Sequence, residues 1–419
     1  MDGRSSNSNK TIRSLDAKVS RRSLLSGFCA AGASLYLPGA TLGAATQGST
    51  ALSGGLSPSS FQLGSSPFCY NGQSLSLSPS AHAIIPVVRF GKWVWKDQPE
   101  DKTGYVDPRK YEVSVGIEWT GTGSASGLQG ATVSPAELNE QTIDSVEIEK
   151  SEGCDAQVRK LTDEVSQFEI VAPSIERGQV IRARVVYQMT LYRNCNGLSQ
   201  ESFPFEQEYP REITKAYLGN SPGIEAGSSM VSKLLSEIAT PELHPWQKAK
   251  IFHEWVWENI EGKHGDYTSV KDALRNRVGD CEERATVFIA LCRAAKIPAR
   301  LVWVPSHAWA EFCLTDKSGK QHWIPSHTAA YPWFGWTGAH ELVFQKGDKI
   351  EVPQEKKPLR LVRDWMRWEG AKPQFRFAAY VKPLGEQSSA DAGPGGRIKL
   401  DDGKWGFLGE HPENEYMRE

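Results

Sequence analysis

The sequence lacks several features that mark particular classes of protein. Its seven cysteines include no Cys-x-x-Cys pair, so a structural zinc site of the finger or ribbon type is not indicated. It has no internal repeat, and its mildly apolar run from Leu24 to Leu37 is too short for a membrane-spanning helix. The net charge of −2 lacks the basic excess that nucleic-acid binding favours. We therefore expect no nucleic-acid partner and no integral membrane segment in the mature chain.

What is present is typical of a soluble globular protein. Hydrophobic residues make up 39% and charged residues 23% of the 419 positions, and this length predicts two or three domains.

The N-terminal residues resemble an export signal. A polar, basic stretch leads into Ser20-Arg21-Arg22-Ser23, a mild apolar run follows, and small residues surround Ala44. This pattern predicts a twin-arginine-type signal over residues 1–45 and an exported protein, periplasmic or extracellular. The alternative is a cytosolic protein with a disordered head. These 45 residues hold six of the 48 basic and two of the 50 acidic residues, so their removal leaves a net charge of −6.

Export would make disulfides permissible for the six remaining cysteines. Cys154 and Cys195 flank two predicted strands and are the preferred disulfide pair.

The rest of the chain divides by composition and period. Residues 46–66 are rich in Gly, Ser, Thr and Gln and predict a flexible linker. Residues 67–215 alternate apolar and polar positions, as in 111–119 and 181–191, which predicts an all-β, sandwich-like domain. Residues 386–419 are rich in Gly, Asp, Glu and Ser and predict a poorly ordered tail.

The remaining residues, 216–385, mix two periods. Helical spacing covers 230–238, a second helix begins near Pro245, and a third runs from Cys281 to about Lys296. Strands are expected over 300–304, 307–314 and 321–325, the last two joined by a turn. This predicts an α+β domain.

The strongest chemical signal is Gly279-Asp280-Cys281-Glu282-Glu283. Asp280 suits a helix N-cap and Glu283 completes a capping box, which places Cys281 in the first turn. Unpaired N–H groups and the helix dipole there favour a thiolate, as nucleophilic acyl transfer requires. The alternative is a small buried residue at a helix start. Cys292 and Cys313 fit that plainer role, in a helix and a strand respectively.

A thiol nucleophile also needs a proton donor and acceptor. His307 begins a predicted strand, where its ring could lean over the start of the cysteine helix. An imidazolium there would stabilise the thiolate and later protonate a leaving amine. The alternative is an ordinary hydrogen-bonded surface histidine.

Together these motifs resemble the transglutaminase-like superfamily of papain-type folds. The resemblance covers residues 216–330 and rests on Gly279-Asp280-Cys281, on the Ala-rich helix that ends near Arg300, and on His307-Ala308-Trp309-Ala310-Glu311. It implies a papain-like transglutaminase core, α+β, with Cys281 as nucleophile and His307 as base. Preceding β-rich domains are familiar in this family.

The sequence departs from the family at the third catalytic position. The family has Trp-x-Pro-x-Asp, whereas this chain has Trp323-Ile324-Pro325-Ser326-His327, so the resemblance places His327 where the acid would be. A neutral histidine can orient the base but offers no compensating charge. His327 is either a working substitute or a sign of a non-catalytic role.

The expected function is acyl transfer from a protein or peptide substrate through a thioester, most simply by a peptidase or amidase. The sequence leaves open a protein-glutamine crosslinking acyltransferase and an inert binding module whose surface uses the aromatic run 331–336. Tyr267 and Trp257 are candidate oxyanion donors. We expect no cofactor and no metal, although Cys281, His307 and His327 have residue types that suit zinc or copper.

Overall fold

A computed structural model describes residues 103–263, 265–305, 307–329 and 331–384, together with Gln98 and two short strands, β15 (Arg397–Lys399) and β16 (Trp405–Phe407). The predicted export signal of residues 1–45 and the predicted linker of residues 46–66 lie outside the described residues. So does most of the predicted tail, residues 386–419. These three assignments stay predictions.

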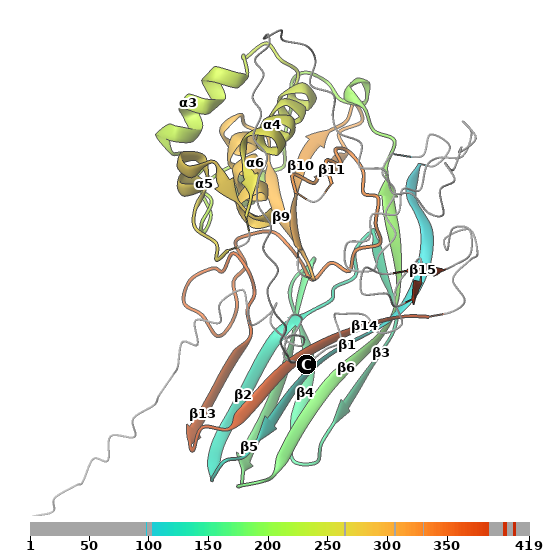
Figure 1. Ribbon diagram of the computed structural model, residues 1–419, viewed down its shortest axis with the longest axis vertical. Helices are drawn as coiled ribbons and strands as arrows, with labels where there is room; N and C mark the ends of the chain where they lie inside the picture. Colours follow the sequence, from blue (N-terminus) through green and yellow to red (C-terminus); the bar gives the residue numbers. More distant parts are fainter. Residues whose placement is uncertain are drawn as a thin grey trace, which may run out of the picture. The chain divides into compact units, whose positions relative to one another are not determined.

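The first sheet has four antiparallel strands in the order β14-β1-β6-β3 (Figure 1). The alternation predicted for its two longest strands is confirmed, because every second residue of β1 from Tyr111 to Trp119 is buried. The bounds are Gly104–Thr120 for β1, Gln141–Lys150 for β3, Val180–Cys195 for β6 and Gln374–Pro383 for β14.

The second sheet has eight strands and runs β11-β10-β9-β12-β5-β2-β13, with β4 also paired to β5. Its short strand β12 joins two halves, since Gln345 pairs with Trp303 of β9 and with Val165 of β5. The bounds are Ala125–Ser134 (β2), Asp155–Thr162 (β4), Val165–Ile175 (β5), Ala299–Val304 (β9), His307–Thr315 (β10), Gln321–Ser326 (β11), Gln345–Lys346 (β12) and Trp365–Gly370 (β13).

One apolar core lies between the first sheet and the β5-β2-β13 part of the second. Trp119 and Tyr187 of the first sheet meet Phe168 of the second within this core. Gly130 makes the close packing possible, because a Cβ there would lie 2.9 Å from the Trp119 ring. This arrangement is the expected β-rich, sandwich-like domain that precedes the core.

Two strands of this β-rich part come from the far end of the described chain. β13 pairs with β2, and β14 pairs with β1 over ten residues from Tyr111 to Thr120. Both strands fall within residues 216–385, the range predicted to form the α+β domain. Their pairing instead places them in the sheets of the preceding β-rich part.

The helices gather around the β9-β10-β11 half of the second sheet (Figure 1). The predicted helices at 230–238, at Pro245 and at Cys281 are confirmed. The bounds are Gln200–Ser202 for the 3-10 helix η1, then Arg211–Tyr217 (α2), Ser229–Ile238 (α3), Pro245–Asn259 (α4), Val270–Asn276 (α5) and Cys281–Ala294 (α6). Two short parallel strands, β7 (Glu261–Gly262) and β8 (Val278–Gly279), pair with each other before α6.

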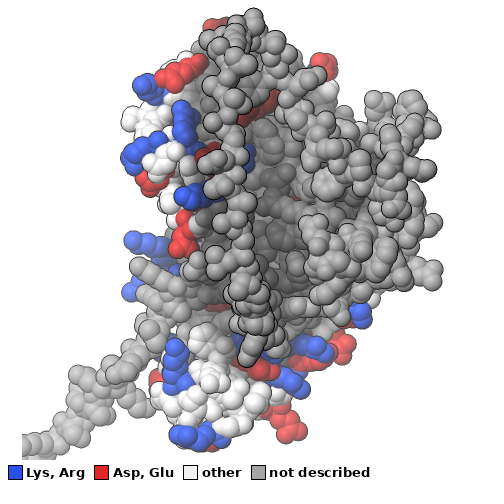
Figure 2. Space-filling model, in the orientation of Figure 1, with Lys and Arg blue, Asp and Glu red and all other residues white. Residues whose placement is uncertain are grey.

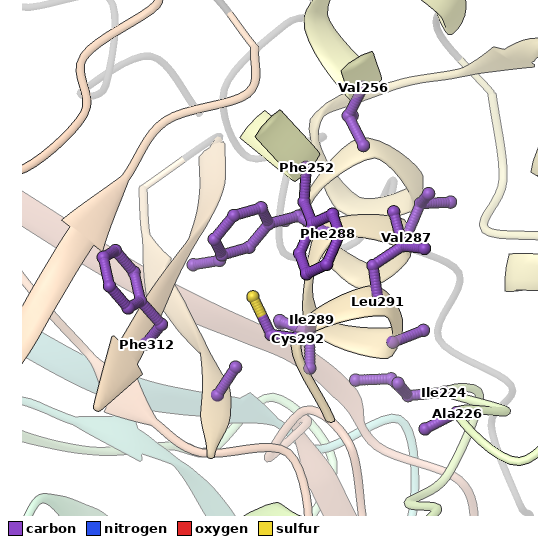
Figure 3. Close-up of a cluster of buried hydrophobic side chains, with 14 of the residues drawn as sticks. Ile224, Ala226, Phe252, Val256, Val287, Phe288, Ile289, Leu291, Cys292 and Phe312 are labelled. Carbon is purple, nitrogen blue, oxygen red and sulfur yellow. The ribbon is translucent and has the colours of Figure 1, made fainter. Parts of the chain in front are cut away.

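Helix α6 forms the centre of this α+β part. All its residues from Glu282 to Arg293 are buried, because it lies against β9 and β10 on one side and α3, α4 and α5 on others. Phe252 of α4, Phe288 of α6 and Phe312 of β10 share this core (Figure 3). Cys292 and Cys313 are fully buried, which confirms their structural role.

The expected disulfide between Cys154 and Cys195 is wrong. Cys154 is a free thiol whose Sγ lies 3.9 Å from the Arg182 carbonyl, near the start of β6. Cys195 is the last residue of that strand, thirteen positions further on. At about 3.3 Å per residue this is roughly 40 Å, far beyond the reach of a disulfide.

Charges on the described surface are interspersed in sign (Figure 2). Neighbouring strands bring opposite charges together, as where Arg184 of β6 lies 2.8 Å from Glu149 of β3. Within the described residues, no helix combines the length and the apolar character that crossing a membrane requires.

Candidate active site

The N-terminus of α6 is capped as the sequence predicted. Oδ1 of Asp280 accepts a hydrogen bond from the Glu282 N–H at 2.8 Å, and Oε2 of Glu283 accepts one from the Asp280 N–H at 3.0 Å. Cys281 is the first residue of this helix and is half-buried. The helix dipole and the remaining N–H groups of the first turn favour a thiolate there.

Glu283 also ties the helix start to the loop before α5. Its second oxygen, Oε1, accepts a hydrogen bond from the Thr268 N–H at 2.8 Å. Gly279 leaves room for this side chain, since a Cβ at that position would come within 2.4 Å of the Glu283 Cβ. The Gly-Asp-Cys motif therefore includes glycine because the buried carboxylate needs the space.

Arg284 is a charged neighbour of Cys281 that the sequence analysis did not single out. Its guanidinium donates to the Trp257 carbonyl at 3.0 Å and lies 4.9 Å from the centroid of the Trp257 ring. Burial lowers the pKa of Arg284, and the nearby Cys281 thiolate opposes that shift. Arg284 thus adds positive charge near the thiol.

His307 is the first residue of β10, the strand next to β9 on the sheet that α6 covers. It is half-buried, and the centroid of its ring lies 5.9 Å from that of His327. The predicted strand start is confirmed. It places His307 on the sheet against which the helix of Cys281 packs.

His327 is fully buried directly after β11, at 1% exposure. Its ring stacks on Trp309 with centroids 4.5 Å apart and meets Trp333 edge-on at 5.1 Å. Burial lowers the pKa of His327 well below its ordinary value, with smaller electrostatic contributions from His307 and His253. The ring is therefore neutral at physiological pH, and neither of its nitrogens has a hydrogen-bond partner in the described structure.

A carboxylate that the sequence analysis missed lies beside His327. Oε2 of Glu341 is 3.9 Å from Nε2 of His327, and the ligand atoms of His307, His327 and Glu341 all lie within 4.8 Å of one another. Glu341 belongs to a long loop between β11 and β12, where the sequence has no period that would reveal it.

Another buried histidine, His253 of α4, borders the same region. Its Nδ1 lies 3.0 Å from Oγ of Ser326, the last residue of β11. Burial lowers the pKa of His253 to about 4, with a smaller contribution from Arg284. His253 is neutral, so its role is to pack and to hold Ser326.

Comparison with known families agrees with this geometry. Residues 232–327 match the model of the Transglutaminase-like superfamily, from within α3 to His327. This stretch is a transglutaminase-like domain. The match includes Cys281 and His307 and ends on His327, the position at which the sequence departs from the family.

The chain also has relatives of more limited similarity. An uncharacterised protein from Haemophilus influenzae is 32% identical over 107 residues, which cover 24% of this chain and 28% of that protein. A candidate cysteine protease from Cytophaga hutchinsonii gives a TM-score of 0.47 at 14% identity, over 68% of this chain and 93% of that one. A candidate protease from Parabacteroides distasonis gives 0.22 at 14% identity, over 55% and 45%.

Of the two suggested oxyanion donors, Tyr267 has its hydroxyl engaged elsewhere. The Tyr267 hydroxyl donates to the Gly223 carbonyl, and its ring lies under the Arg360 guanidinium at 3.5 Å. Trp257 holds Arg284 through its ring and its carbonyl. The backbone N–H of Cys281 stays the natural candidate donor.

The expectation that the aromatic run 331–336 forms a recognition surface is wrong for its two largest members. Trp333 is 2% exposed and Trp336 is 7% exposed. Trp333 packs against His327 and stacks on Tyr331 with centroids 4.5 Å apart. These rings pack beside the histidine cluster, and they expose little aromatic surface to a binding partner.

Proposed function

We propose that this protein is a cysteine-nucleophile enzyme that hydrolyses peptide or carboxamide bonds through a thioester. The observation that carries the proposal is the position of Cys281 at the capped start of α6, a buried helix packed on the strand that His307 begins. The match of residues 232–327 to the transglutaminase-like superfamily supports it.

The chemistry follows from the two residues. The Cys281 thiolate attacks the substrate carbonyl, and the N–H groups at the helix start stabilise the developing oxyanion. His307, as imidazolium, gives its proton to the departing amine when the C–N bond breaks. Water then attacks the thioester and gives a proton to His307, and the C–S bond breaks, which releases the acid and restores the Cys281 thiolate with the His307 imidazolium.

The charge that the family obtains from aspartate has a different source here. His327 is neutral and buried, whereas Glu341 brings a carboxylate to the far side of the same cluster. We assign His327 to orient the cluster and Glu341 to stabilise the positive charge that forms on His307.

The decisive test is the rate of alkylation of Cys281 by iodoacetamide against pH, read by peptide mass spectrometry. An ordinary thiol of pKa near 8.5 is about 3% ionised at pH 7, so a thiolate held by an ion pair reacts about 30-fold faster there. We expect this fast reaction in the native chain and its loss in His307→Ala. His322→Ala is the matched control, because His322 lies in the same hairpin but pairs with Asp316 at 2.7 Å.

A rate that follows an ordinary thiol, unchanged in His307→Ala, would refute the proposal. If the pair is present, incubation with peptide and carboxamide substrates follows, with Cys281→Ala as the inactive control. Products formed with water indicate a hydrolase, whereas products that incorporate an added amine indicate a crosslinking acyltransferase.

We also propose export of the protein, supported by Ser20-Arg21-Arg22-Ser23 and the following apolar run. A reporter fused behind residues 1–45 should leave the cytoplasm of a bacterium with a twin-arginine pathway. Replacement of Arg21 and Arg22 by lysine should keep the reporter in the cytoplasm.

A further inference from the structure

Three metal-ligand side chains, one of them the proposed base His307, converge in one cluster. His307 begins β10, His327 follows β11, and Glu341 lies in the loop before β12. Their ligand atoms lie within 4.8 Å of one another. The residues are far apart in the chain, so the fold itself brings them together.

His327 supplies an independent sign that a ligand belongs here. Both nitrogens of its ring are buried without a hydrogen-bond partner in the described structure. A buried polar atom without a partner costs about 1–3 kcal/mol, and such atoms are rare unless a water or an ion satisfies them. Stacking on Trp309 fixes the ring plane, and burial keeps the imidazole neutral with a lone pair available.

The ligand set indicates the class of ion. Two imidazole nitrogens and one carboxylate oxygen, with a further position open, form the set that catalytic zinc sites use. Ligand atoms about 2.0–2.1 Å from a tetrahedral ion lie roughly 3.3 Å apart. His327 Nε2 and Glu341 Oε2 are 3.9 Å apart, and all three ligand atoms lie within 4.8 Å of one another, so completing the site requires shifts of up to roughly 1.5 Å.

We propose that His307, His327 and Glu341 bind one divalent transition-metal ion of the Zn²⁺ class, and that the bound ion inactivates Cys281 by occupying His307. The inhibitory half of this inference rests on the proposed function. An imidazole whose lone pair is coordinated cannot accept or return the proton of the thiol. Metal occupancy would then switch the enzyme off until a chelator or a competing ligand removes the ion.

The binding half is tested on the full chain, freed of metal by a chelator and titrated with ZnCl₂ by calorimetry and by equilibrium dialysis with metal analysis. We expect one ion per chain in the native protein. His327→Gln and Glu341→Gln should each weaken binding at least tenfold, and Co²⁺ should give visible ligand-field bands that both variants lose. Glu341 is partly exposed, with a side chain 17% accessible, so its variant tests the site even if His327→Gln fails to fold.

Two controls separate this site from its alternatives. His322→Asn removes a histidine that pairs with a carboxylate on the same hairpin, and it should still bind one ion. Cys281→Ser should also bind one ion. The site is refuted if the native chain binds no Zn²⁺, if His327→Gln and Glu341→Gln both bind normally, or if binding is lost in Cys281→Ser.

The inhibitory half is tested by Cys281 alkylation at pH 7 in metal-free and Zn²⁺-saturated protein. We expect at least a tenfold slower reaction with Zn²⁺, reversed by chelator, and little effect of Zn²⁺ in His327→Gln. Stoichiometric binding that leaves the alkylation rate unchanged refutes the inhibitory role. An alkylation rate typical of an ordinary thiol in the metal-free chain refutes the proposed function and with it the inhibition. The number of Zn²⁺ ions bound per chain still decides whether the metal site exists.

Discussion

Oε2 of Glu341 lies 3.9 Å from Nε2 of His327, so a carboxylate adjoins the residue to which the sequence resemblance assigns the place of the family acid. His327 is buried and neutral, and it cannot balance a positive charge on His307. Glu341 can, because its carboxylate lies in the same cluster as both histidines. In the proposed mechanism, the acid of the family pattern is therefore displaced by 14 positions along the chain, to another loop.

This displacement predicts the behaviour of three variants. In metal-free protein, Glu341→Gln removes the carboxylate and should slow Cys281 alkylation at pH 7 about tenfold, as expected when one nearby charge is lost. The double variant Glu341→Gln with His327→Asp returns a carboxylate to the family position and should recover most of that rate. Glu341→Gln with His327→Asn, which restores no charge, should not.

Equal rates in the native chain and Glu341→Gln would show that the carboxylate has no part in holding the thiolate. Recovery by His327→Asn as well as by His327→Asp would show that shape matters and charge does not.

The capping of α6 leads to a second prediction. Glu283 accepts hydrogen bonds from the N–H groups of Asp280 and Thr268 with its two oxygens. Glutamine has one acceptor, so Glu283→Gln points an NH₂ group at one of these buried N–H donors. We expect a loss of about 1–3 kcal/mol in the free energy of unfolding, measured in urea. Glu254→Gln, at an exposed site on α4 near Lys250, is the control and should change little.

A loss in Glu283→Gln no larger than in the control would mean that the two hydrogen bonds do not hold the helix start. If stability falls as expected, the alkylation rate of Cys281 should fall too, since the cap sets the direction of the thiol.

Much of the fold was predictable because its signals are local. The alternation of 111–119 and 181–191 gives the long strands, and Asp280 with Glu283 gives the start of α6. The same local signals placed Cys281 and His307 on a helix start and a strand start. A backbone cap or a period can be recognised within a few residues, whatever the rest of the chain does.

Other features depend on contacts between distant segments and leave no local pattern. β12 has two residues, yet it joins β9 to β5. β14 pairs with β1 although more than 250 positions separate Tyr111 from its partner Pro383. Glu341 is found only when its loop is placed against β11. The Cys154–Cys195 prediction failed for the same reason, since neighbouring strands in sequence do not show which strand ends meet.

A third prediction concerns a fully buried ion pair that anchors α6. Nη2 of Arg293 lies 2.8 Å from Oδ2 of Asp348, and both side chains are inaccessible to solvent. Asp348→Asn keeps the shape but leaves the guanidinium charge without its counter-ion. Removal of one partner of a buried pair costs about 3–5 kcal/mol, which we expect in urea unfolding.

The control for this pair is Asp155→Asn, which removes the partner of Lys150 on an exposed strand. It should leave the unfolding midpoint nearly unchanged, because solvent already screens both charges. Similar small effects at both sites would show that Arg293 finds other acceptors, such as the Ala299 carbonyl that it already contacts at 2.7 Å.

Asp364 gives a prediction with a defined pH dependence. It is buried without a cationic partner among the described contacts, and its Oδ1 accepts a hydrogen bond from the Thr132 hydroxyl at 2.6 Å. Burial raises the pKa of Asp364 to about 6 from its ordinary 3.8, and the Thr132 hydrogen bond opposes that shift. Between pH 4 and 6 the folded chain therefore keeps a proton that the unfolded chain has lost.

The sign follows from proton linkage. Stability falls as pH rises wherever the unfolded chain binds fewer protons than the folded one, so this group costs stability above pH 6 and costs none below pH 4. A shift of about two pKa units corresponds to about 3 kcal/mol. Asp364→Asn, which is neutral at every pH, should therefore raise the free energy of unfolding at pH 7 by up to that amount and leave it nearly unchanged at pH 4.

Urea titrations of the native chain and Asp364→Asn at pH 4 and pH 7 measure the difference directly, since all other groups titrate equally in both proteins. Thr132→Val should act in the opposite direction at pH 7, because it removes the donor that stabilises the carboxylate. An effect of Asp364→Asn that is the same at both pH values would mean that the carboxyl is no harder to ionise in the folded chain than in the unfolded one. Its burial would then be matched by a stabilising partner, and Thr132→Val would reveal whether that partner is the hydroxyl.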